Sequence, residues 1–255
     1  MCMERLSTWV CLVAMFFSTA AHADMVTDSA AFDKAYIPAL ALTSQGDAEK
    51  SKTAMVRLNQ AWRDFSNAHR KDHPGDDAWQ QGFSEIDKWI LEADANVAHE
   101  DKLMDAHNVL EHVRVILMQQ RQKHGIDYFL DYQTAYHEPM ERIVLAAKGK
   151  TPATLTEQDI DKIRNAIPEL EKRWNAVRNA RYDPGNLGLS RARNAEVKRS
   201  IELETESIAG LKHAFAGSDK SAMIQHAVAI KPPFAQLYML FGEFSQSGKL
   251  GVNRP

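Results

Sequence analysis

Cysteine is almost missing from this chain of 255 residues, and both copies lie close to the N-terminus. Cys2 and Cys11 precede the point after residue 23 at which we expect the chain to be cleaved. Residues 24–255 therefore have no thiol for a disulfide, a thiolate metal site or a cysteine nucleophile. Covalent attachment of a c-type haem is excluded as well, because it needs a CxxCH motif.

The chain also lacks the short motifs that mark common classes of enzyme. It has no nucleophile elbow, no HExxH helix, no phosphate-binding loop and no glycine-rich dinucleotide fingerprint. The run HEPME, which begins at His137, has Glu141 where a zinc protease needs its second histidine, and Pro139 would disturb the helix. We therefore expect a protein without a catalytic site.

Excess charge of one sign is absent too. The formal net charge is -3, and basic residues form no stripe along the chain. This pattern argues against binding to nucleic acid or to an anionic membrane surface. After residue 23 no apolar run reaches the roughly 20 residues that a membrane span needs, so we expect no membrane anchor in the cleaved protein.

The N-terminus has the pattern of a secretory signal peptide. A short head containing Arg5 precedes an apolar run from Leu6 to Ala20, and small residues flank a cleavage position after Ala23. A lipid anchor would need a cysteine at that position, whereas Cys11 lies in the middle of the apolar run. We predict cleavage after Ala23 and export to the periplasm.

The remaining sequence has helical periodicity nearly throughout. Met55, Leu58, Trp62 and Phe65 recur at steps of three and four residues, which places them on one face of a helix. Residues 108–122 carry a similar apolar stripe. Because no segment alternates at the two-residue period of a strand, the sequence predicts an all-α fold.

Several features occur twice, in the same order. Tyr36 is matched by Tyr136, Trp62 by Trp174, and the Pro-Gly pair at 74–75 by one at 184–185. The predicted helices lie near residues 30–44, 48–70, 78–97 and 101–123, and then near 131–147, 156–181, 190–215 and 219–243. Four amphipathic helices with short connections form an up-and-down bundle. We predict two tandem four-helix units from an internal duplication, residues 24–127 and 128–255.

Two local signals refine this prediction. Thr154, with Glu157 three residues later, fits a capping box at the start of the sixth helix. Pro232 and Pro233 fall within the eighth helix and should break or bend it, since proline lacks the backbone N–H and its ring clashes with the preceding turn. The corresponding first-unit helix has no proline, so we expect the units to differ here.

The helix pairs at 33–65 and 207–242 resemble the first and last helix pairs of soluble b-type and c-prime-type cytochromes, which are periplasmic four-helix bundles. The resemblance implies a haem held between a methionine on the first helix and a histidine near the end of the last. Met140 matches the methionine in the second unit, and His124 matches the histidine in the first. Neither unit has both residues, so a non-covalent haem would rest on Met140 or His124 alone.

Metal-binding side chains are plentiful, because nine of the ten histidines and seven of the ten methionines follow residue 23. They suit copper, zinc, iron or nickel. The densest group comprises His99, His107, Glu111 and His112, followed by His137, Glu138, Met140 and Glu141. If the two helices fold back on each other, a rise of 1.5 Å per residue puts His112 and His137 within about 6 Å of the same height. We predict a metal site of His112, His137 and Glu141, with His107 nearby.

These patterns leave two classes of function open. The first is a periplasmic protein that binds a transition metal or haem for storage, delivery or electron transfer. The second is a structural or interaction module, such as a stress-related chaperone or a sensor component, which would work through a protein partner or self-association. Under the second hypothesis the polar residues beside the apolar stripes are solvated or paired across helices, and the methionines fill the core.

Overall fold

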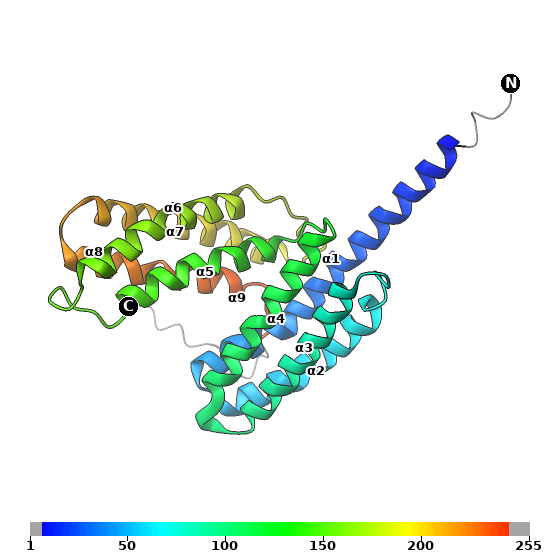
Figure 1. The fold of residues 1–255 in the computed structure, drawn as a ribbon, viewed down its shortest axis with the longest axis horizontal. Helices are drawn as coiled ribbons and strands as arrows, with labels where there is room; N and C mark the ends of the chain where they lie inside the picture. Colours follow the sequence, from blue (N-terminus) through cyan, green and yellow to red (C-terminus); the bar gives the residue numbers. More distant parts are fainter. Residues whose placement is uncertain (1–6, 245–255) are drawn as a thin grey trace.

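The computed structural model describes residues 7–244 and the side chains of residues 25–244, a part of the chain that contains helices and turns but no strand (Figure 1). The all-α prediction is confirmed. The helices are α1 (Ser7–Gln45), α2 (Ala48–His69), α3 (Asp77–Val97), α4 (Leu103–Lys123), α5 (Phe129–Ala147), α6 (Glu157–Asn179), α7 (Arg191–Ala216), α8 (Lys220–Ala229) and α9 (Lys231–Met239), with a 3-10 turn η1 (Glu100–Lys102) before α4.

Helices α1 to α4 form one bundle. α1 packs along α2, and α3 packs along α4. Contacts of α1 with α4 and of α2 with α3 join the two pairs into a four-helix bundle. Its interior is aromatic: the rings of Trp62 and Phe83 lie 5.4 Å apart, and those of Phe32 and Tyr36 lie 5.5 Å apart. Burial of each such side chain stabilises the fold by about 1.5–3 kcal/mol, so the apolar stripes supply the core of the bundle.

Helices α5 to α9 form the second bundle, beside the first (Figure 1). α5 packs along α6, and α7 packs against both α8 and α9. The last helix is divided in two, because α8 ends at Ala229, Ile230 caps both pieces, and Pro232 and Pro233 lie in the first turn of α9. The predicted break at the two prolines is thus confirmed.

Corresponding residues of the two bundles have similar partners. Trp62 Nε1 donates a hydrogen bond to Asp87 of α3 at 2.8 Å, and Trp174 Nε1 donates one to Thr205 of α7 at 2.9 Å. In each bundle the second helix therefore bonds to the third through its tryptophan. This correspondence is what an internal duplication would produce, although the duplication itself stays a prediction.

The N-cap of α6 lies two residues after the predicted one. Thr156, rather than Thr154, is the N-cap; its hydroxyl accepts from the backbone N–H of Asp159 at 3.2 Å, and the Asp159 carboxylate accepts from the N–H of Thr156 at 3.2 Å. Thr154 hydrogen-bonds within a turn with Thr151. The capping box therefore pairs Thr156 with Asp159, and the proposed pairing of Thr154 with Glu157 is wrong.

A buried polar joint links the bundles at the α4–α5 connection. Arg121 of α4 donates to both carboxylate oxygens of Asp131 on α5, at 2.9 and 2.6 Å, and to Ser29 of α1 at 3.2 Å. Tyr128 donates to Asp33 of α1 at 2.6 Å. Because Arg121 and Asp131 are only 5% and 4% exposed, this joint fixes how α5 leaves the first bundle.

The N-terminal part of α1 extends past the other helices (Figure 1). Residues 1–6 of the predicted signal peptide lie outside the described residues, as do the side chains of residues 7–24. Cleavage after Ala23 therefore stays a prediction. Within the described part of the chain, no helix combines the length and apolar character that a membrane crossing requires.

Candidate functional site

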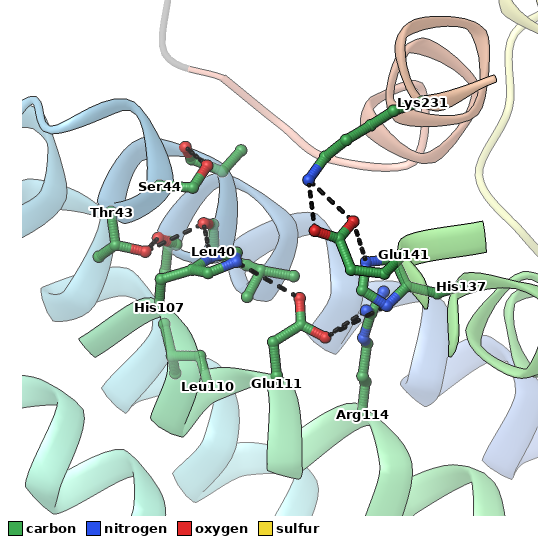
Figure 2. A network of polar contacts seen from close by, with 12 residues as sticks. Leu40, Thr43, Ser44, His107, Leu110, Glu111, Arg114, His137, Glu141 and Lys231 are labelled. Atoms are coloured by element: carbon green, nitrogen blue, oxygen red, sulfur yellow. Dashed lines mark hydrogen bonds and ion pairs between the residues drawn. The ribbon is translucent and has the colours of Figure 1, made fainter. Parts of the chain in front are cut away.

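Four of the candidate metal-binding side chains meet where α4 crosses α5 (Figure 2). α4 supplies His107 and Glu111, and α5 supplies His137 and Glu141. Each pair is spaced by four residues, which places its two members on the same face of a helix. We call these four residues the His–Glu cluster.

The donor atoms of the His–Glu cluster follow one another at nearly equal spacing. His107 Nε2 lies 3.7 Å from Glu111 Oε1, and Glu111 Oε2 lies 3.8 Å from His137 Nδ1. His137 Nε2 then lies 3.9 Å from Glu141 Oε2. These separations exceed hydrogen-bond length, and the four side chains are 22 to 25% exposed, so solvent reaches them.

The two imidazole rings of the cluster have different surroundings. His107 Nδ1 lies 2.9 Å from the carbonyl oxygen of Leu40, which can only accept, so Nδ1 carries a proton and donates it, while Nε2 faces Glu111. Burial, together with the nearby charges of Arg114 and Lys231, lowers the pKa of His137 to about 2. The His137 ring is then neutral, the form of histidine that binds metals.

Each carboxylate of the cluster already has a cationic partner. Arg114 of α4 donates to Glu111, and Lys231 at the start of α9 donates to both oxygens of Glu141 at 3.0 and 2.9 Å. The charges of the two carboxylates are thus balanced by two cations. As the side chains lie, the described residues contain no group of three or more His, Cys, Asp or Glu that could hold a metal ion.

His112 does not take part in this arrangement. Its ring stacks on Trp89 of α3 at 4.7 Å between centroids and an interplanar angle of 27°. The predicted set of His112, His137 and Glu141 is therefore not assembled, and His107 and Glu111 lie beside His137 instead. Positions along the two helix axes were not sufficient to predict the contact, because a step of one residue turns a side chain by about 100° around the axis.

The two residues expected from the cytochrome resemblance lie in separate surroundings. The ring of His124 stacks on His73 at 3.6 Å and meets Trp79 edge-on at 5.0 Å, all within the first bundle. Met140 is 0% exposed, three turns into α5. No haem-binding pair is formed by His124 and Met140, and the resemblance to cytochromes stays a prediction.

Sequence reasoning identified the histidines and carboxylates of the region but missed their cationic partners. Arg114 carries a signal, since it lies three residues after Glu111 on the same helix. Lys231 carries none, because 90 residues separate it from Glu141. Only the packing of α9 against α5 brings the two together.

Comparison with protein-family models, with curated proteins and with solved structures finds no significant match. The His–Glu cluster and its charged partners are therefore the observations on which a function can be proposed.

Proposed function

We propose that this protein is an exported, non-enzymatic helical bundle that binds one divalent transition-metal ion at the His–Glu cluster, for storage or delivery. One observation carries the proposal. His107 Nε2, the two oxygens of Glu111 and His137 Nδ1, from neighbouring helices, succeed one another at 3.7 and 3.8 Å in a place that solvent reaches.

The spacing of the donors suits a shared ion after small side-chain rotations. Nitrogen and oxygen ligands lie about 2.0–2.2 Å from Zn²⁺, so two ligands of one ion can be at most about 4.2 Å apart. The pairs that join Glu111 to His107 Nε2 and to His137 Nδ1 fall within that span. Glu141 faces Nε2 on the opposite edge of the His137 ring, so it would not share this ion. Binding then requires Glu111 to turn toward the point between the two imidazole nitrogens and away from Arg114.

The donor set indicates the class of metal. Imidazole and carboxylate ligands favour Zn²⁺, Fe²⁺ or Ni²⁺, whereas Cu⁺ prefers thiolate and thioether sulfur. Met140, the methionine nearest the cluster in sequence, is 0% exposed and packed in the core. The hydrogen bond from His107 to Leu40 supplies the outer-shell support that fixes a metal-binding histidine.

A titration with matched variants tests the proposal. The full chain is expressed, and the exported product is stripped with a chelator and titrated with Zn²⁺ by calorimetry. We expect about one ion per chain, and loss of that binding in His107→Gln and in His137→Gln. The control is His112→Gln, because His112 lies on the same helix but stacks on Trp89 outside the cluster.

Two results would refute the proposal. One is the absence of saturable Zn²⁺, Fe²⁺ or Ni²⁺ binding by the folded protein. The other is binding that persists in a His107→Gln/His137→Gln double variant. A Soret band after incubation with haem would instead favour the cytochrome-like alternative.

A further inference from the structure

Helices α6 and α7 lie side by side in the second bundle, and a groove runs between them (Figure 1). A cavity of about 510 Å³ lies between the end of α6 and residues 198–206 of α7. A smaller cavity of about 250 Å³ continues it along the same two helices, and Arg178 and Thr205 line both. The two cavities therefore form one groove, which we call the α6–α7 groove.

The first bundle closes the corresponding place between α2 and α3 with an ion pair. Asp87 of α3 accepts hydrogen bonds from Trp62 at 2.8 Å and from Arg70 at 2.6 Å. In the second bundle the matching tryptophan donates to Thr205, and Tyr182 follows this tryptophan by eight residues, as Arg70 follows Trp62. Because neither Thr205 nor Tyr182 is charged, no such pair draws α6 and α7 together at this end.

The groove has apolar walls that are held in place. Val177 lines the larger cavity and Ile208 the smaller, and both side chains are buried. The ring of Tyr182 lies 4.4 Å from that of Phe129, and its hydroxyl donates to Asn194 at 2.8 Å. Small-molecule sites are typically preformed, largely apolar cavities of about 300–1,000 Å³, and the larger cavity has this size.

Charged side chains stand at the edges of the larger cavity. Among its residues on α7, Lys198 lies at one end and Glu206 at the other. Arg178 from α6 and Glu202 from α7 lie between these ends. None of the four side chains makes an ion pair or a hydrogen bond with another residue that the structure describes. A ligand can therefore meet these charges without breaking an existing contact.

The order of the charges indicates the chemistry of the ligand. Eight residues separate Lys198 from Glu206, a distance of about 12 Å along α7 at 1.5 Å per residue. An extended peptide spans about 3.3–3.6 Å per residue, so about three residues place its two charged termini at this separation. Each peptide unit also offers one donor and one acceptor, which suit the carboxylate of Glu202 and the guanidinium of Arg178 between the ends.

We propose that the α6–α7 groove binds a short peptide with apolar side chains and free termini. Its C-terminal carboxylate pairs with Lys198, its N-terminal ammonium pairs with Glu206, and its side chains cover the apolar walls. The site lies between α6 and α7 rather than between α4 and α5, so it does not depend on the proposed metal site.

Calorimetry with trileucine, a tripeptide with free termini, tests the proposal on the exported product of the full chain. We expect saturable binding of about one peptide per chain. Trileucine amide lacks the carboxylate, and N-acetyl-trileucine lacks the ammonium. Each should bind about fivefold more weakly than trileucine, the upper range for an exposed ion pair.

Variants assign each terminus of the peptide to one side chain. Lys198→Met should weaken trileucine binding about fivefold but leave the affinity for trileucine amide unchanged, because the amide has no carboxylate to lose. Glu206→Gln should weaken trileucine binding and leave that of N-acetyl-trileucine unchanged. Lys172→Met and Glu196→Gln are the matched controls, since both residues are exposed on the same two helices and neither lines the groove. Both controls should bind trileucine as the wild type does.

Loss confined to the matching pairs of variant and peptide supports the proposal, and unchanged binding of the capped peptides shows that the groove is intact in each variant. The absence of saturable trileucine binding overturns it. Equal affinity of the wild type for free and capped peptides overturns it as well, because the charges at the groove then have no part in binding. Zn²⁺ binding at the His–Glu cluster is unaffected by any of these outcomes.

Discussion

The hydroxyl of Tyr136 on α5 donates a hydrogen bond to the carboxylate of Glu204 on α7, inside the second bundle. Both residues are 0% exposed, and the other oxygen of Glu204 has no hydrogen-bond partner among the described residues. The corresponding Tyr36 donates instead to the backbone carbonyl of Leu110 at 2.8 Å. The tyrosine hydroxyl therefore bonds to a buried acid in the second bundle and to a neutral backbone carbonyl in the first.

This difference predicts a pH dependence of stability. Burial raises the pKa of Glu204 from 4.5 to about 8, although the hydrogen bond from Tyr136 acts in the opposite direction. The folded state holds the Glu204 proton more tightly than the unfolded state does. The contribution of this proton to the free energy of unfolding is therefore complete below about pH 4.5 and is lost as the pH rises toward 8. We expect Glu204→Gln to gain stability relative to wild type between pH 5 and 8.5, by about 1.4 kcal/mol for each unit of pKa shift.

Urea denaturation of both proteins at several pH values measures this effect. Glu202→Gln is the control, because Glu202 lies on the same helix and is exposed. A constant difference in unfolding free energy between wild type and Glu204→Gln across this range would contradict the prediction.

The start of α6 allows a direct test of which threonine caps the helix. Thr156→Ala removes the acceptor for the N–H of Asp159 and should lower the free energy of unfolding by about 1 kcal/mol. Thr154→Ala removes only hydrogen bonds with Thr151 in an exposed turn and should have a smaller effect. Thermal denaturation of the two variants gives the order, and a larger loss in Thr154→Ala would restore the capping box first predicted from the sequence.

The helices and the break at residue 230 could be predicted because their causes are local. Apolar spacing indicated where Trp62 and Trp174 would be buried, and the ring of Pro232 cannot continue a helix. The capping box was misplaced because two threonines three residues ahead of acidic residues fit the same motif. Hydrogen bonds within the turn, which the spacing does not encode, decide between Thr154 and Thr156.

The candidate site could be predicted only in part, because it depends on how two bundles meet. The four-residue spacing of His137 and Glu141 was visible, but the choice of His107 over His112 follows from the crossing of α4 with α5. Lys231 comes from α9, and no sequence pattern relates it to Glu141. Contacts between distant helices therefore determine the electrostatics of the cluster.

The signal peptide makes a prediction that is independent of the metal. When the full chain is expressed in a bacterium with a periplasm, we expect the soluble periplasmic fraction to contain a protein that begins at Asp24. N-terminal sequencing or intact mass measures the cleavage position. Ala23→Arg should block processing by placing a large charged residue at the cut, whereas Ser18→Ala should process normally. An intact Met1 on the exported protein would contradict the prediction.

The joint between the bundles should be among the most sensitive parts of the molecule. Arg121 neutralises Asp131, and its charge also opposes the burial that raises the pKa of Asp33 to about 6. Arg121→Met would leave Asp131 in the interior without its cation, at a cost of about 3–5 kcal/mol in unfolding free energy. Chemical denaturation measures the loss at neutral pH.

Two further variants separate the buried charge from lost packing at this joint. Arg121→Met combined with Asp131→Leu removes both charges of the pair and should recover part of the stability. Arg173→Met breaks a pair with Glu169 that is 45% and 37% exposed, so it should cost less than about 1 kcal/mol. If Arg121→Met were no more harmful than Arg173→Met, Arg121 would not be needed to hold the two bundles together. The hydrogen bond from Tyr128 to Asp33 and the contacts of α4 with α5 and of α1 with α9 would then supply that connection.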